Sequence, residues 1–291
     1  MAMSFLWLVT IGWAFSFSLI GVYLSGHVDD DISVLIRTSL ALLLFLPFML
    51  RARPTPGRAL ALIAIGGVQL GLMYLLLFRA FAYLSVPELL LFTIFTPLYI
   101  TVLDEILTGR LRLPLTWWLA ATLAVIGAGV IRYGDFSAAA WTGFALIQGA
   151  NLSFAAGQVL YRRLPMGQRG DGLQEFGYFF LGATLVAAVS ALLFGDLEQL
   201  PVGAVQWTVL LWLGLGASGV GYWLWNTAAR GVNTGQLAVM NNMLIPAGIL
   251  VNVLIWSRDV DWLRLGIGAA LLFAALWLAQ HGQLKSKGSV L

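Results

Sequence analysis

The sequence has no cysteine and very few charged side chains. Without cysteine the chain can form no disulfide bond, thiolate nucleophile or cysteine metal site. His27 and His281 are its two histidines, so little is available for metal binding or acid–base catalysis. Charged residues make up 10% of the chain, against about 25% of an average soluble domain. A water-soluble protein needs far more charged surface, so the composition excludes an ordinary soluble enzyme.

Hydrophobic side chains make up 60% of the chain and lie in long runs without charge. A bilayer core about 30 Å thick requires about 20 mostly apolar residues per helix, because no water there can satisfy an open backbone. The first run lacks a basic leader and is too long for a cleaved signal peptide, so we interpret it as a span. The sequence therefore predicts an all-α polytopic membrane protein with ten transmembrane helices. Their expected ranges are 5–24, 32–50, 59–82, 86–107, 115–132, 140–161, 175–194, 204–228, 234–256 and 262–281.

The basic residues outside these ranges or at their ends are sorted between alternate loops. Loops rich in Lys and Arg stay in the cytoplasm, so both termini are expected on the cytoplasmic side of the inner membrane. Arg37 and Arg79 fall inside spans near the outer surface, where Arg37 can extend to the interface. The membrane centre is thus expected to hold almost no ionised group, and no basic stripe suggests a nucleic-acid partner. Eleven basic residues lie on the cytoplasmic side (Arg51, Arg53, Arg58, Arg110, Arg112, Arg162, Arg163, Arg169, Arg230, Lys285 and Lys287) and three on the other (Arg132, Arg258 and Arg264).

The chain contains a weak internal repeat. Residues 79–131 align with residues 228–277 when Pro97 is matched with Pro246, and both segments continue into a helix rich in Gly and Ala. Five spans in each half mean that the two halves enter the membrane from opposite sides. Inverted repeats of this kind build transporters whose site lies near the midplane. We therefore predict two inverted five-helix halves, residues 1–135 and 136–291.

Three stretches form recognisable patterns. Arg37 is followed by the small and apolar run TSLALLLFLPF. The stretch Ala80–Arg110 has a short loop and a long helix with a central proline, ending in EILTGRLRL, and the second half contains GYWLWNTAARGVNTGQLAVMNNMLIPAGILVNVLIW. Together they resemble the EamA-like members of the drug/metabolite transporter superfamily over essentially the whole chain, with a departure at Ser257–Asp259, where a small residue plus an acidic group is usual. The resemblance implies a ten-helix secondary transporter, often an exporter of amino acids, related metabolites or drugs.

Glu88 is a carboxylate within an apolar span, and such residues are functional candidates by default. However, Ser85 and Glu88 have the S-x-x-E spacing of a capping box, and Pro87 suits the first turn of a helix. We therefore expect Glu88 to cap its helix, and Asp104 and Glu105 to be solvated or paired at the inner helix end. Without an ionisable group at the centre, facilitated transport or exchange is favoured, and proton antiport is the alternative.

Pro97 and Pro246 lie near the centres of the fourth and ninth spans. Each proline removes an amide and frees the carbonyl four residues earlier, here the carbonyl of Thr93 or Asn242. Proline is tolerated in membrane helices without any role. Its matching position in both halves favours a hinge or a cavity-lining bend.

The sixth span carries a polar stripe. Gln148, Asn151 and Gln158 follow helical spacing and share one face. Amides in hydrocarbon are costly unless they are satisfied, so this face cannot meet lipid. It either joins helices or lines a wet cavity.

Other spans carry aromatic and polar side chains on one face. Trp13 and Phe17 share a face of the first span, Tyr74 and Phe78 share one of the third, and the eighth carries a similar group. The candidate solute-binding residues are therefore Trp13, Phe17, Tyr74, Phe78, Thr93, Gln148, Asn151, Gln158, Tyr222, Trp225, Asn226 and Asn242, with Pro97 and Pro246 as hinges.

The function expected from these features is secondary transport, most simply export, by alternating access across the cytoplasmic membrane. A cavity of aromatic, amide and hydroxyl groups suits a small neutral or zwitterionic solute such as an amino acid. Efflux of lipophilic cations or drugs, by proton antiport, is the alternative, and a sugar ranks third. No catalytic residue, metal or cofactor is expected, because the spans hold no catalytic Asp or Ser–His pair; a non-transporting scaffold is the other rival. Membrane lipid is the expected partner, and small-residue pairs such as Gly67 and Gly71 fit internal packing or a homodimer equally well.

Overall fold

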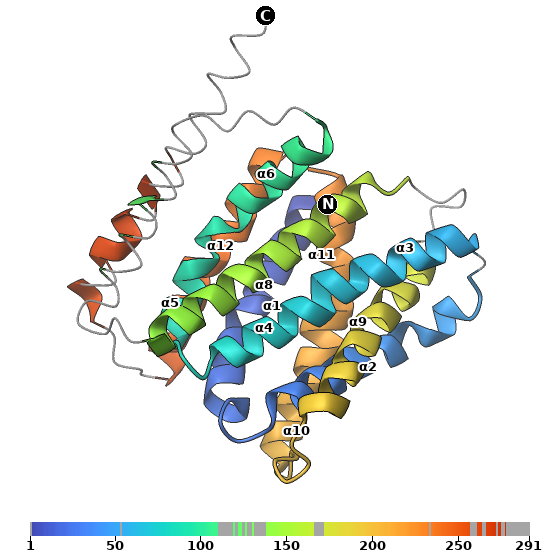
Figure 1. Ribbon diagram of the computed structural model, residues 1–291, viewed down its shortest axis with the longest axis horizontal. Helices are drawn as coiled ribbons and strands as arrows, with labels where there is room; N and C mark the ends of the chain where they lie inside the picture. Colours follow the sequence, from blue (N-terminus) through green and yellow to red (C-terminus); the bar gives the residue numbers. More distant parts are fainter. Residues whose placement is uncertain are drawn as a thin grey trace, which may run out of the picture.

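The computed structural model describes residues 2–52, 54–109, 138–165, 172–232 and 234–256, with scattered positions within 119–130 and 261–277. Within these ranges the regular structure is helical and no strand occurs. The long helices pack side by side in one bundle (Figure 1). In it α9 packs against α2 and α3, α8 against α4 and α6, and α1 against α11 and α12.

Eight of the ten expected spans fall within the described ranges, and each of them is helical. The spans 115–132 and 262–281 lie largely outside the described residues, so the count of ten is not confirmed. The elements are α1 (Ala2–Leu19) with the π-helix η1 (Ile20–Leu24); α2 (Asp30–Met49); α3 (Pro56–Gly66), the π-helix η2 (Gly67–Leu72) and α4 (Met73–Ala80); α5 (Val86–Phe92), the 3-10 helix η3 (Thr93–Phe95) and α6 (Thr96–Leu107); α8 (Ala138–Arg163); α9 (Gly172–Phe194); α10 (Ala204–Leu211), the π-helix η4 (Trp212–Val220) and α11 (Gly221–Arg230); and α12 (Thr234–Trp256).

The exterior of the bundle is suited to lipid. Six helical stretches in the described part are long and apolar enough to cross a membrane: Ala2–Leu24, Asp30–Met49, Pro56–Ala80, Val86–Leu107, Gly172–Phe194 and Ala204–Arg230. Large apolar side chains such as Leu43, Leu185 and Leu254 are exposed on them and on α12. In water such a surface would be an aggregation liability. The structure thus confirms the expected helical membrane fold.

Short polar caps fix the helix ends. Asp29 accepts a hydrogen bond from the Ile32 amide at 2.8 Å and so caps α2. At the start of α5, the Glu88 carboxylate accepts hydrogen bonds from the amide and the hydroxyl of Ser85, each at 2.7 Å. The expected capping role of Glu88 is confirmed.

Glycine allows the closest helix contacts. A Cβ atom on Gly66 of α3 would overlap the carbonyl of Phe179, and one on Gly182 of α9 would overlap the carbonyl of Ile63. The two backbones therefore touch, as small residues permit in membrane helices. Further along the same span, a Cβ atom on Gly71 would meet Val186 and the Ala183 carbonyl of α9, so of the two uses expected of Gly67 and Gly71 the structure shows internal packing.

Candidate functional site

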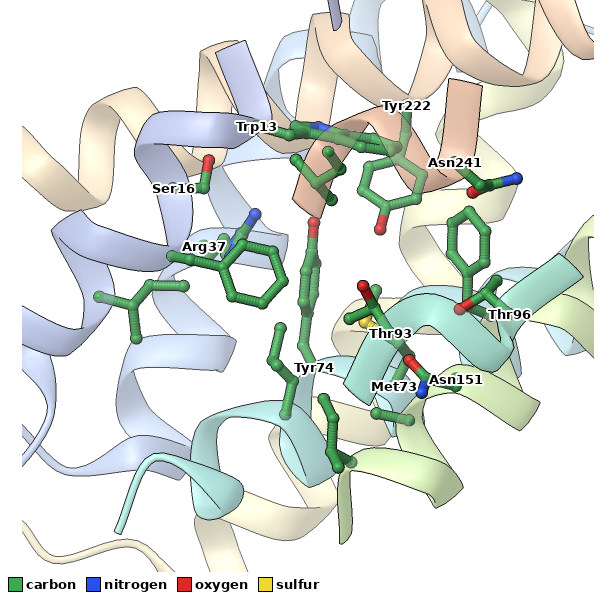
Figure 2. A pocket seen from close by; sticks show the side chains of 17 residues that line it. Trp13, Ser16, Arg37, Met73, Tyr74, Thr93, Thr96, Asn151, Tyr222 and Asn241 are labelled. Atoms are coloured by element: carbon green, nitrogen blue, oxygen red, sulfur yellow. The ribbon is translucent and has the colours of Figure 1, made fainter. Parts of the chain in front are cut away.

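A cavity lies between the helices, and every described span except α9 contributes to its wall (Figure 2). Its volume, including the open space at the mouth, is about 700 Å³. The wall is mainly aromatic and aliphatic, with amide and hydroxyl groups and one charged side chain. The lining residues are Trp13, Ser16, Phe17, Ile20, Arg37, Met73, Tyr74, Leu77, Thr93, Thr96, Ile147, Ala150, Asn151, Phe154, Tyr222, Asn241 and Leu244.

Arg37 of α2 is the charged residue in this wall, and its position corrects a prediction. It does not extend to the interface but is buried at 3% exposure. Its Nε donates a hydrogen bond to Ser218 Oγ at 2.6 Å, and its guanidinium carbon lies 3.8 Å from the centre of the Tyr74 ring. Among the described residues no carboxylate pairs with it. The interior of the bundle therefore holds a cation, where almost no ionised group was expected, because a hydroxyl and an aromatic face hold the side chain inward.

The partners of Arg37 come from separate parts of the chain. Ser218 belongs to the π-helix η4, and its Oγ also lies 2.8 Å from the Tyr74 hydroxyl of α4. The preceding carbonyl, of Ala217, accepts a hydrogen bond from Trp13 Nε1 at 2.8 Å. π-Helical turns are often found at functional sites. Here one π-helix orients both the guanidinium and an indole of the cavity wall.

Three aromatic rings of the cavity wall pack against one another. The Trp13 ring centre lies 4.6 Å from that of Tyr222 and 6.4 Å from that of Phe154. The Trp225 ring centre lies 4.9 Å from that of Trp13 with the rings tilted, and Trp225 is not part of the cavity wall. We call Trp13, Phe154 and Tyr222 the aromatic floor. Rings of this kind offer flat apolar contact area with defined geometry.

The polar stripe of α8 has two roles. Asn151 lines the cavity and also donates a hydrogen bond to the Phe92 carbonyl at 2.9 Å. Gln148 donates to the same carbonyl at 3.3 Å and accepts from the Tyr99 hydroxyl at 3.0 Å. The carbonyl is accessible because the 3-10 helix η3 breaks the regular pattern just before Pro97. It belongs to Phe92, one residue before the expected Thr93.

Half of the candidate binding residues line the cavity. Those six are Trp13, Phe17, Tyr74, Thr93, Asn151 and Tyr222, whereas Phe78, Gln148, Gln158, Trp225, Asn226 and Asn242 are not part of the wall. Of the hinge candidates, Pro97 is buried in α6 and Pro246 is exposed within α12. Ser16 and Met73 lie on the predicted faces but were not among the candidate binding residues. The wall residues that sequence reasoning missed are Ile20, Arg37, Leu77, Thr96, Ile147, Ala150, Phe154, Asn241 and Leu244. Arg37 was expected at the interface, and the signal that could have placed it at the site is that it is an arginine inside an apolar span.

Ion pairs join helices at both ends of the bundle, away from the cavity. Where α2 begins, Arg79 donates to the Asp31 carboxylate at 2.8 Å, and Ser190 Oγ donates to the same carboxylate at 2.6 Å. At the opposite end, Arg163 pairs with Asp104 at 2.7 Å, as expected for a paired helix end. These pairs tie α2, α4 and α9 at one end and α6 and α8 at the other.

Comparison with known proteins identifies relatives over almost the whole chain. The model of the EamA-like transporter family matches residues 1–133. A biotin transporter of Salmonella typhimurium is 48% identical over 95% of this chain and 92% of its own, and one of Escherichia coli K12 is 47% identical over the same shares. A probable biotin transporter of Pseudomonas aeruginosa is 46% identical over 97% and 98%. These names do not support the amino-acid cargo expected from sequence.

A solved crystal structure shares the fold. It is 18% identical and superposes with a TM-score of 0.65 over 96% of both chains.

Proposed function

Because the chain belongs to the EamA-like transporter family, we propose that it carries biotin across the cytoplasmic membrane. The family and its relatives are transporters and not enzymes, in line with the expectation that no catalytic residue is present. The relatives' names and the identity of 46–48% over nearly the whole chain support this cargo in place of an amino acid or a drug.

The observation that carries the proposal is the position of Arg37 in the cavity wall. Biotin is an anion at neutral pH, because its acyl chain ends in a carboxylate. A buried cation without a partner is costly, and a carboxylate that forms paired hydrogen bonds with a guanidinium relieves this cost. Since Nε of Arg37 already binds Ser218, the two terminal nitrogens would hold the carboxylate.

The other end of the cavity suits the rings of biotin. In Figure 2, Arg37 lies on one side of Tyr74, and Thr93, Thr96, Asn151 and Asn241 lie on the other. The cyclic urea of biotin has two N–H donors and a carbonyl acceptor, which amides and hydroxyls can satisfy. Its thioether ring would lie against Trp13 and Tyr222, because sulfur packs favourably on aromatic rings.

We also propose alternating access between two inverted halves, 1–135 and 136–291. Corresponding spans share a π-helix in one case and a proline in the other, which supports the repeat, although the proline interrupts the helix in the first half alone. The third span of each half contains a π-helix, η2 or η4, and the fourth contains Pro97 or Pro246. Such interruptions between halves that rock against each other are common at transporter sites.

Counterflow of labelled solutes in proteoliposomes tests the proposal. We expect saturable exchange of labelled biotin that unlabelled biotin competes away, and no exchange of leucine, serine or a lipophilic cation. Empty liposomes and liposomes with the heat-denatured protein are the controls. Absence of biotin exchange by folded protein would refute the proposed cargo, and exchange of an amino acid alone would restore the expectation from sequence.

A further inference from the structure

A layer of buried amides lies one helical turn beyond the cavity, toward the end of the bundle where α1 begins. Asn226 follows Tyr222 by four residues on α11, Gln158 follows Phe154 by four on α8, and Gln69 precedes Met73 by four on the oppositely directed third span. Residues four apart lie on the same face of a helix. Each amide therefore lies beneath a residue of the cavity wall. We call Gln69, Gln158 and Asn226 the amide layer.

These amides are buried and poorly satisfied. Gln69 and Gln158 have no exposed surface, and Asn226 has 1%. Gln69 Nε2 donates to Asn226 Oδ1 at 3.4 Å. Neither polar atom of Gln158 has a hydrogen-bond partner, nor do Gln69 Oε1 and Asn226 Nδ2. Buried amides without partners destabilise a fold, so packing alone does not explain three of them at one level.

The layer lies between the aromatic floor and a contact of Arg230 with Tyr161. On the cavity side, Trp225 packs against Trp13, and its Nε1 is also without a partner. On the other side, one turn further along α11 and α8, Arg230 donates to the Tyr161 carbonyl at 2.9 Å and lies over the Tyr161 ring. A solute leaving the cavity through this end would pass the floor, then the amides, then the Arg230–Tyr161 contact.

We propose that the amide layer is a second binding station on the transport path, which takes a cyclic urea or amide group of the solute when the floor opens. The proposal rests on the proposed function, in which the solute is biotin. The layer has amide N–H donors and carbonyl acceptors without partners. The ureido ring can pair with both, because it has a carbonyl acceptor and two N–H donors. The unsatisfied amides then lower the stability of the conformation described and bind the solute during transport.

Gln158→Met and Gln69→Met test this role, because methionine keeps the length of the side chain and removes the amide. In Gln69→Met the aliphatic part that packs on Gly157 is preserved. A purely structural amide would give lower stability on substitution. If the amide serves transport and has no partner, the thermal midpoint should stay unchanged or rise, and biotin binding in detergent should stay unchanged. Counterflow should fall about tenfold, the equivalent of one lost hydrogen bond.

Gln148→Met is the matched control, because that amide is bonded to Phe92 and Tyr99; its thermal midpoint should fall. Gln158→Asn, which retains an amide, should recover part of the counterflow. Unchanged counterflow in both methionine variants would overturn the second station, and so would a joint loss of thermal midpoint and binding in both. Wild-type protein that neither binds nor exchanges biotin would instead refute the proposed function.

Discussion

Replacing Arg37 by glutamine should show how much of the affinity for biotin depends on the carboxylate and how much on the rings. The guanidinium has no carboxylate partner among the described residues and is held by Ser218 and Tyr74. If it binds the carboxylate of biotin, Arg37→Gln removes a buried ion pair in the loaded protein. In the empty protein it removes a buried cation, whose loss is partly favourable. Affinity should therefore fall much more than stability.

The magnitude follows from the burial of the site. Truncating one partner of a buried, hydrogen-bonded charge pair costs about 2–5 kcal/mol, which corresponds to an affinity about 30-fold to a few thousand-fold lower. For the empty protein, loss of the stacking on Tyr74 costs about 0.5–2 kcal/mol and is offset by relief of the desolvated charge. Its thermal midpoint should change little.

The assay compares equilibrium binding of biotin with that of biotin amide, which keeps the rings and lacks the charge. Wild-type protein should prefer biotin, and Arg37→Gln should bind the two about equally. Arg163→Gln is the matched control: its ion pair with Asp104 is exposed, worth about 0–1 kcal/mol, and its loss should leave both affinities unchanged. If Arg37→Gln lowers the affinity for biotin and for biotin amide by the same factor, Arg37 shapes the cavity and does not bind the carboxylate.

Three further outcomes are expected. Gly66→Ala forces a methyl group into the Phe179 carbonyl, and we expect a loss of at least about 1–3 kcal/mol in thermal unfolding, whereas Gly57→Ala, with open space around it, should be neutral. Asp31→Asn leaves a half-exposed Arg79 without its anion and should lower stability by about 1–3 kcal/mol; an unchanged midpoint would show that this contact is dispensable. Glu88 caps α5, so biotin counterflow should be insensitive to an imposed pH gradient; strong dependence that Glu88→Gln abolishes would indicate proton coupling instead.

The spans could be predicted because membrane thickness fixes their length. Every described span begins and ends within about three residues of its expected range, and the capping box at Ser85 was readable from spacing alone. The interruptions were not readable. The π-helices η2 and η4 each insert extra residues into a turn, and no rule of composition places them.

The same physics explains the partial success at the site. Neighbouring residues on a helix point about 100° apart. An error of one residue therefore replaces a side chain of the cavity wall with one that packs against a neighbouring helix. Asn241 lines the cavity where Asn242 was predicted, and Phe92 supplies the carbonyl expected from Thr93. On α11 the predicted group of Tyr222, Trp225 and Asn226 spans two levels, with Tyr222 in the wall and Asn226 in the amide layer.

The position of Arg37 also changes the argument about the cargo and its coupling. A membrane centre without charge favoured a neutral or zwitterionic solute, and exchange was favoured because no proton carrier was present. If Arg37 binds the carboxylate of the solute as proposed, an empty carrier that closes buries a cation held by Ser218 and Tyr74 alone, whereas a loaded carrier buries an ion pair. Closing around the anion is therefore the less costly step. A carrier of this kind would favour exchange over return of the empty form, so the proposed site predicts exchange from the charge that the cavity holds.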